Sequence, residues 1–292
     1  MGRNSGSTWQ QLMSASIEVI DVSKAFGGVK AVSHCTLKVE AGSITGLIGP
    51  NGAGKTTLFN IVAGAIRPDS GRVLLGGEDI TGLPPHVLFH KGLVRTFQIP
   101  HEFSTLTALE NLMVVPPHQP GERLFTTWLK PSLVRDREAE VRARAREVLD
   151  FLNLSHVRNE LAGNLSGGQK KLLELGRTMM TEARTVLLDE IAAGVNRTLL
   201  KDLLAAIRRL NAEAGYTFFV IEHDMDMIGA LCDPVIVMAQ GTVMRTGRLE
   251  ELREDPEVIE AYFGGPVKTA AVPAAAAPAG GAAGDNGREA QP

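Results

Sequence analysis

The chain has 292 residues, of which 44% are hydrophobic and 22% are charged. This balance is typical of a globular protein whose core needs no disulfides. The net charge of −3 argues against a nucleic-acid partner, because such binders usually carry a basic excess. No apolar run approaches the roughly 20 residues of a membrane-spanning helix, so any spans are expected on another chain. Cys35 and Cys232 are expected to be reduced core thiols.

Both ends of the chain are expected to lie outside the folded unit. Residues 1–16 are polar and lack the apolar stretch of a secretory signal, which predicts a flexible N-terminal tail. Residues 266–292 are mostly Ala, Gly and Pro, which bury too little apolar surface to offset the entropy of ordering, and this predicts a disordered tail. The predicted folded unit therefore spans residues 17–265.

Short apolar segments rich in β-branched residues alternate with helical patterns through most of this unit. Segments that are apolar throughout are typical of strands buried on both faces of a sheet. The alternation predicts an α/β fold with a mainly parallel sheet. The predicted strands are 17–21, 43–49, 185–189, 217–222 and 234–239, and the predicted helices are 55–64, 168–180 and 198–214.

The segment from about 94 to 165 interrupts this alternation with few strand signals. Within it, residues 135–154 carry one apolar stripe with charges elsewhere, which predicts an amphipathic helix. Its charged side could bind nucleic acid, but a solvated helix face is the preferred interpretation. We expect 94–165 to form a helical subdomain inserted into the α/β core. The apolar stripe comprises Val141, Ala145, Val148, Leu149 and Leu152.

The sequence GPNGAGKT at 49–56 fits the phosphate-binding pattern G-x-x-x-x-G-K-[ST], between a predicted strand and a predicted helix. Backbone N–H groups and the helix N-terminus are expected to hold phosphates. Lys55 is expected on the β- and γ-phosphates, Thr56 on Mg²⁺ and Thr57 on the α-phosphate. The motif alone leaves kinase, GTPase, helicase and transporter motor open, although no guanine-reading NKxD pattern is present. The predicted nucleotide-binding residues are Gly49, Pro50, Asn51, Gly52, Ala53, Gly54, Lys55, Thr56 and Thr57.

The sequence TVLLDE at 185–190 is an apolar strand that ends in two acids. Beside a phosphate loop, Asp189 is expected to orient Mg²⁺ and its water. Glu190 is expected to polarise the attacking water as the catalytic base, which favours hydrolysis over transfer to another substrate. The alternative, two acids that merely end a strand, loses weight because the phosphate loop is present.

The sequence LSGGQ at 165–169 lies between these two motifs, in an order and spacing that resemble ATP-binding-cassette (ABC) ATPases over residues 17–264. These residues open a predicted helix and form a second anion-binding cap; an ordinary Ser-capped helix is the alternative. The resemblance implies a P-loop NTPase core, an N-terminal antiparallel β subdomain and an inserted α-helical subdomain. It also implies a head-to-tail dimer in which the cap closes on ATP held by the partner. The cap comprises Ser166, Gly167, Gly168 and Gln169.

Further positions match this family one by one. Phe26, in KAFGG, matches the aromatic residue that stacks on adenine, and Val32 is expected beside it. Gln98, in VRTFQIP, matches the glutamine that senses Mg²⁺ and water and links the core to the helical subdomain. His223, in VIEHD, matches the histidine that contacts the γ-phosphate, and residues 193–196 match a loop that crosses the dimer interface.

A finer resemblance, to the branched-chain amino acid transport subgroup, rests on KAFGGVKAV, AAGVN, IEHDMDMI and PEVIEAYFG. It implies a terminal helix at 256–263 and an ATPase that uses ATP and Mg²⁺ to import branched-chain amino acids or a similar small polar solute. The implied partners are integral membrane permease subunits, a second ATPase subunit in a homo- or heterodimer and, indirectly, a solute-binding protein. The implied location is peripheral, on the cytoplasmic face of the inner or plasma membrane.

Other functions stay open at this point. They are transport of urea or amides, lipid export, a soluble ABC ATPase that acts on ribosomes or DNA, and a nucleotide-gated module that does not hydrolyse ATP. One departure from the family bears on activity, because Ile191 stands where a proline usually follows the two acids. Isoleucine restores an N–H and relaxes the backbone, but both catalytic acids remain, so we expect hydrolysis and leave the effect of Ile191 on its rate open. Asn196 replaces the more usual aspartate.

Overall fold

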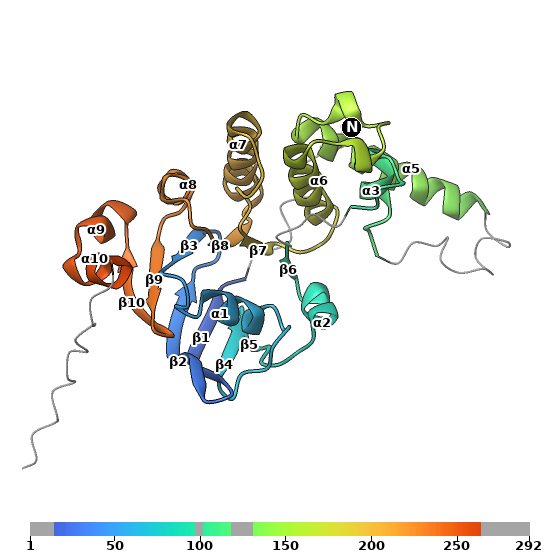
Figure 1. Cartoon of the computed structure of the whole chain (residues 1–292). Helices are drawn as coiled ribbons and strands as arrows, with labels where there is room; N and C mark the ends of the chain where they lie inside the picture. The colour runs from blue at the N-terminus through green and yellow to red at the C-terminus, as the bar shows by residue number, and fades with distance from the viewer. Residues whose placement is uncertain (1–14, 97–101, 118–130, 264–292) are drawn as a thin grey trace, which may run out of the picture.

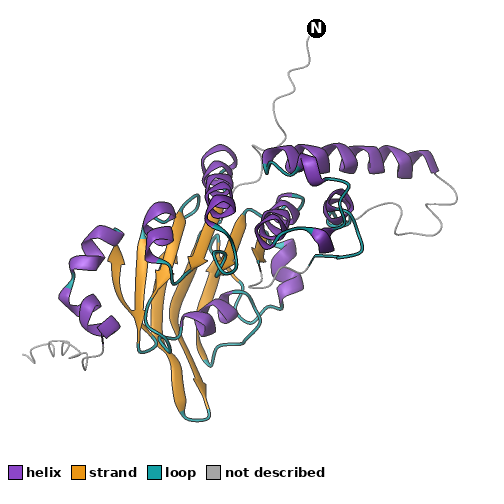
Figure 2. Ribbon diagram, turned by 45° about the horizontal axis from the view of Figure 1, so that its top comes forward, coloured by secondary structure: helices purple, strands orange, loops and turns teal. Residues whose placement is uncertain are grey.

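The computed structural model describes residues 15–96, 102–117 and 131–263. The predicted C-terminal tail and residues 1–14 of the predicted N-terminal tail lie outside these ranges. Two sheets form the centre of the molecule, with helices outside them (Figure 1, Figure 2).

The larger sheet has six strands, and its four central pairings are parallel, while β10 pairs antiparallel with β9. Every residue of β3, β7, β8 and β9 is buried, as the apolar segments predict. The predicted strands 43–49, 185–189, 217–222 and 234–239 are thereby confirmed. In sheet order, the strands are β10 (Thr242–Gly247), β9 (Val235–Ala239), β3 (Ile44–Ile48), β8 (Thr217–Ile221), β7 (Thr185–Asp189) and β6 (Leu93–Arg95).

The smaller sheet is antiparallel and carries the N-terminal part of the described chain. It confirms the antiparallel β subdomain that the family resemblance implies. Its edge meets the larger sheet, where the Ser33 N–H donates to Gly241 O at 2.9 Å. In sheet order, its strands are β2 (Val29–Val39), β1 (Ile17–Phe26), β4 (Ser70–Leu75) and β5 (Glu78–Asp79).

The predicted helices 55–64, 168–180 and 198–214 are confirmed as α1, α6 and α7, with ends that differ by one or two residues. The terminal helix at 256–263 is confirmed as α10. In order along the chain, the described helices are α1 (Lys55–Val62), α2 (Pro85–His90), α3 (Ala108–Met113), α5 (Pro131–Phe151), α6 (Gly167–Met179), α7 (Arg197–Ala214), α8 (Met225–Leu231), α9 (Leu249–Glu254) and α10 (Pro256–Phe263), with short 3-10 turns at Ser155–Val157 and Ala162–Asn164.

Helices α3, α5 and α6 pack on one another to one side of the sheets (Figure 1). The predicted amphipathic helix is α5, and all five residues of its apolar stripe are at most 3% exposed. Gly176 on α6 permits close packing, because a Cβ there would lie 2.8 Å from Leu152 Cδ1. None of the helices in the described ranges is long and apolar enough to cross a membrane.

Two boundaries differ from the sequence-based expectation. Val94 and Arg95 belong to β6 and pair with β7, so the helical segment expected from 94 begins later. Three residues on a sheet edge are too few to show a strand pattern. Ala15 and Ser16, expected in the flexible tail, are held in place: the Ala15 N–H donates to Thr185 Oγ1 at 3.3 Å, and the Gly76 N–H donates to Ser16 O at 2.8 Å.

Candidate functional site

The loop at 49–54 leaves the carboxyl end of β3 and enters α1. Gly54 has a φ of +96°, and a Cβ there would lie 2.2 Å from Ala31 O. A Cβ on Gly49 would lie 2.1 Å from Met238 O. Both glycines are therefore required, because neighbouring backbone closes on the loop from two strands. This tight packing fixes the loop from which α1 presents its first N–H groups.

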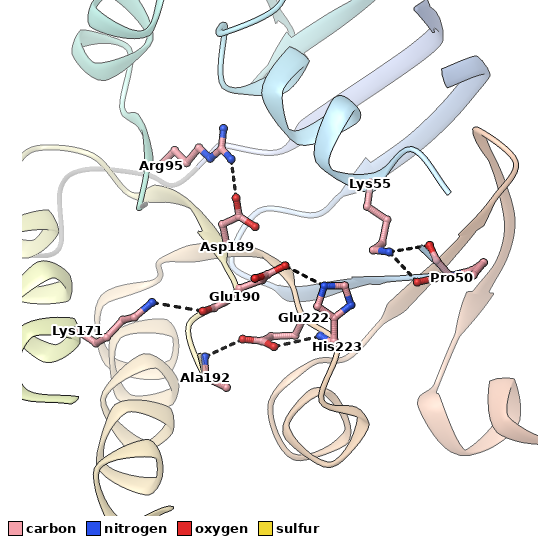
Figure 3. A network of polar contacts seen from close by, with 10 residues as sticks. Pro50, Lys55, Arg95, Lys171, Asp189, Glu190, Ala192, Glu222 and His223 are labelled. Carbon is pink, nitrogen blue, oxygen red and sulfur yellow. Dashed lines mark hydrogen bonds and ion pairs between the residues drawn. The ribbon is translucent and has the colours of Figure 1, made fainter. Parts of the chain in front are cut away.

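Lys55 is 5% exposed and reaches back across the loop, where its Nζ donates to Gly49 O at 2.7 Å and to Pro50 O at 3.0 Å (Figure 3). Burial lowers the pKa of Lys55, and the nearby Glu190 carboxylate acts in the opposite direction. Thr56 is exposed at the first turn of α1, and Thr57 is half-buried. A cation and a hydroxyl thus stand at a helix N-terminus, which is the arrangement that binds phosphate groups.

The two predicted acids lie where β7 ends, next to the end of β8. Asp189 Oδ2 accepts a hydrogen bond from Arg95 Nη2 at 2.5 Å. Glu190 Oε1 lies 2.9 Å from His223 Nε2, so the structure brings the predicted base and the predicted histidine together (Figure 3). Glu190 has a φ of +47°. Such a conformation is uncommon for a residue other than glycine, and it recurs at functional sites.

Two buried residues join this centre although sequence reasoning missed them. Glu222 is 5% exposed, and its carboxylate accepts from the Ala192 N–H at 2.8 Å and from the His223 N–H at 3.1 Å. Lys171, on α6, donates from Nζ to Glu190 O at 3.3 Å, and burial lowers its pKa. The sequence signal for Glu222 was its place at the end of a buried strand, beside the histidine.

The LSGGQ segment forms the N-terminus of α6. The Gln169 N–H donates to Ser166 Oγ at 3.4 Å, and the Ser166 N–H donates to Gln169 Oε1 at 2.9 Å, which together make a capping box. The predicted helix start is thereby confirmed, while anion binding at this cap stays a prediction. Ser166 and Gly167 are exposed, whereas Gly168 is buried against α7, where a Cβ would lie 2.5 Å from Leu199 Cδ1.

A phosphate loop, two acids at a strand end and a second capped helix thus occur in one α/β fold. A sequence model described as ABC transporter matches residues 32–193. The chain belongs to the ABC transporter family. It is 41% identical over 248 residues to the high-affinity branched-chain amino acid transport ATP-binding protein BraF of Pseudomonas aeruginosa, a match that covers 85% of this chain and 97% of the relative.

A second relative is the high-affinity branched-chain amino acid transport ATP-binding protein LivG of Escherichia coli K12, 38% identical over 239 residues that cover 82% of this chain and 94% of that protein. A crystal structure of a nucleotide-free ATP-binding cassette from an ABC transporter superposes with a TM-score of 0.73 at 37% identity, over 86% of this chain and 100% of that chain. The ADP conformation of MJ1267, an ATP-binding cassette, superposes with a TM-score of 0.72 at 37% identity, over 86% and 99% of the two chains. This chain is therefore an ATP-binding, ATP-hydrolysing subunit of an ABC transporter.

The three other residues expected around the nucleotide of this ABC ATPase are Phe26, Val32 and Gln98. Phe26 is 48% exposed at the end of β1, with the Lys24 ammonium 5.6 Å from its ring centroid. Val32 is 1% exposed and packs in the core, and its expected place beside the adenine stays a prediction. Gln98 lies outside the described residues.

The two departures from the family pattern, Ile191 and Asn196, both lie between Glu190 and the start of α7. Ile191 is 4% exposed and packs in the core. Asn196 caps α7, where its Oδ1 accepts from the Leu199 N–H at 2.9 Å. An aspartate would make the same cap, so the asparagine keeps this local function.

Proposed function

We propose that this ABC ATPase hydrolyses ATP with Glu190 as the base and energises import of branched-chain amino acids or a similar small polar solute. The observation that carries the catalytic part is the 2.9 Å contact between Glu190 Oε1 and His223 Nε2, near Lys55 at the start of α1. The names of the two curated relatives support the cargo.

The phosphate loop binds the nucleotide in this proposal. Its backbone N–H groups face the phosphates, Lys55 places its ammonium on the β- and γ-phosphates, and Thr57 reaches the α-phosphate. The exposed ring of Phe26 stacks on the adenine. The Lys55 ammonium already lies against Gly49 O and Pro50 O of the loop, so little rearrangement is needed to place its charge on the phosphates.

Mg²⁺ is assigned to Thr56 and Asp189. In the described part of the chain, no cluster of three or more His, Cys, Asp or Glu side chains forms a metal site. A hydroxyl at the first turn of α1 and one carboxylate at the end of β7 nevertheless fit Mg²⁺, which keeps several waters and takes its other ligands from phosphates. When bound, Mg²⁺ neutralises charge that develops on the phosphate oxygens.

Hydrolysis requires a base next to the attacking water. Glu190 accepts the proton of that water on its carboxylate, and His223 orients the γ-phosphate and holds the Glu190 side chain in position. Gln98 is proposed as a second group that senses the metal and the water. The left-handed backbone at Glu190 turns its carboxylate towards His223, whose N–H is anchored by Glu222.

The proposed site is composite. Ser166 and Gly167 are exposed at the N-terminus of α6 and are free to face the γ-phosphate of a second ATPase subunit, with Gln169 as part of the same cap. Gly168 contributes by letting α6 pack closely on α7. The further partners proposed are two permease subunits and a solute-binding protein. The proposed location is the cytoplasmic face of the inner or plasma membrane.

Substitution of Glu190 tests the catalytic assignment. Glu190→Gln keeps the shape but cannot accept the proton, so turnover should fall at least about 100-fold. Affinity for a fluorescent ATP analogue should stay within about threefold, because the phosphate loop is untouched. Glu213→Gln, which alters an exposed glutamate paired with Arg209 on α7, is the matched control. Undiminished turnover of Glu190→Gln would contradict the proposal.

Reconstitution tests the cargo. The ATPase and its permease subunits are placed in proteoliposomes with the cognate binding protein, and uptake of labelled leucine, valine and isoleucine is compared with uptake of urea. We expect ATP-dependent uptake of the amino acids, abolished by Glu190→Gln. Uptake of urea without the amino acids would reject the cargo while leaving the ATPase assignment intact.

A further inference from the structure

Arg95 lies at the centre of the site, although no motif singles it out. Its Nη2 donates to Asp189 Oδ2 at 2.5 Å (Figure 3), and its Nη1 donates to Asn60 Oδ1 at 2.5 Å. Its guanidinium carbon lies 5.7 Å from the centroid of the Phe59 ring. One side chain therefore bridges β6, the phosphate-loop helix α1 and the end of β7.

The pair formed with Asp189 is well shielded from solvent. The Arg95 side chain is 18% exposed and the Asp189 side chain is 11% exposed. Water screens such a pair only partly, so the guanidinium strongly reduces the negative potential at the carboxylate. Arg95 Nε is buried and has no hydrogen-bond partner among the described residues, so the bonds to Asp189 and Asn60 hold the head group.

A divalent cation drawn to Asp189 must compete with this guanidinium. The two cations repel each other, and Asp189 Oδ2 already accepts from Arg95. The phosphates of a nucleotide add several negative charges at the neighbouring loop. These charges favour binding of the metal at Asp189. Arg95 can stay in place when the metal binds, because its Nη1 still donates to Asn60 Oδ1.

We propose that Arg95 is a positioning residue that makes divalent-cation binding at Asp189 conditional on a bound nucleotide. The inference rests on the proposed assignment of Asp189 to the metal. Arg95 weakens metal binding to the protein alone much more than metal binding to the protein with nucleotide. The metal then enters with the nucleotide and leaves with it, and Asp189 does not retain a stray cation.

The test measures Mn²⁺, a paramagnetic substitute for Mg²⁺, by electron paramagnetic resonance of the full chain with and without ADP. The measured quantity is the Mn²⁺ dissociation constant without ADP divided by the Mn²⁺ dissociation constant with ADP. In Arg95→Gln, the constant without ADP should fall by about tenfold, the equivalent of one charge-assisted hydrogen bond. The constant with ADP should change much less, so the ratio should shrink. If Arg95 had a purely structural function, its substitution would weaken Mn²⁺ binding both with and without ADP, or would change neither constant.

Two controls make the result specific. Arg184→Gln removes another buried arginine, at the opposite end of β7, where Nη1 donates to Tyr216 Oη at 2.7 Å; its Mn²⁺ ratio should match the wild type. Asp189→Asn should remove the site that Mn²⁺ reports. If the Mn²⁺ site survives Asp189→Asn, the ion binds elsewhere and the inference is overturned.

A conservative variant keeps the test decisive if Arg95→Gln fails to fold, as judged by its melting curve. Arg95→Lys retains the charge but reaches only one of the two acceptors, so its ratio should lie below that of the wild type by a few-fold. An unchanged or larger ratio would overturn the inference. If the wild type binds no Mn²⁺ even with ADP, the proposed metal site itself fails, which is a separate outcome.

Discussion

Replacement of Glu222 by alanine should remove the hydrogen bonds that connect the two loops carrying Glu190 and His223. Glu222 directly follows β8 and is 5% exposed. Its Oε1 accepts from the Ala192 N–H at 2.8 Å, and its Oε2 accepts from the His223 N–H at 3.1 Å. The alanine variant leaves both donors without these acceptors.

The magnitude follows from these two bonds. A hydrogen bond to a charged group contributes about 1.5–3 kcal/mol, so the pair contributes about 3–6 kcal/mol to the free energy of unfolding. Alanine also removes the desolvation penalty of a buried carboxylate, which offsets part of this loss. We therefore expect a net loss of about 2–4 kcal/mol, with each kcal/mol lowering the melting temperature by about 2–4 °C in a domain of this size. Glu222→Gln keeps one acceptor and should lose about half as much.

Thermal unfolding and steady-state ATPase assays measure the two consequences separately. At a temperature where the variant is folded, kcat should fall, because the backbone of His223 has lost an anchor, while KM for ATP should change less. Glu213→Ala, on the exposed face of α7, is the matched glutamate control and should change the melting temperature little. A Glu222→Ala variant with the stability and kcat of the wild type would refute the reasoning.

Three further outcomes are expected. Gly54→Ala should abolish measurable nucleotide binding in an equilibrium titration, because its Cβ would lie 2.2 Å from Ala31 O at a φ of +96°. Burial raises the pKa of Cys35 to about 11 and of Cys232 to about 12, so neither thiol should react with a disulfide reagent at pH 8 until denaturant exposes it. Burial lowers the pKa of Lys55, so the unfolded chain binds its proton at alkaline pH where the folded chain does not, and this group adds stability as pH rises towards its ordinary pKa. Lys55→Met should therefore show a smaller rise, or a steeper fall, in melting temperature between pH 8 and 10 than the wild type.

The sequence predicted those parts of the fold that depend on contiguous residues. Each fully buried parallel strand is a short apolar run, and the phosphate loop is a continuous motif in which Gly49 and Gly54 face neighbouring backbone. The capping box at Ser166 is likewise a pattern of four consecutive residues. Local chemistry decides these features, so reading along the chain is sufficient to find them.

The contacts that organise the candidate site are not local. Arg95 and Asp189 are 94 residues apart in sequence, and Glu222 bonds to the backbone of Ala192 from 30 residues away. Nothing in the residues around Arg95 shows which carboxylate it will meet, because β6 reaches β7 only through sheet pairing.

The same long-range contacts explain how the site keeps its shape without the proline that usually follows the two acids. Proline would restrict the backbone through its ring. Here the Glu190 N–H donates to Ile221 O at 3.0 Å, and the Ala192 N–H donates to Glu222. Ile191 itself is 4% exposed in the core. The segment is therefore restrained on both sides of Ile191 and by the burial of its side chain, so packing supplies the restraint that a proline ring would otherwise give.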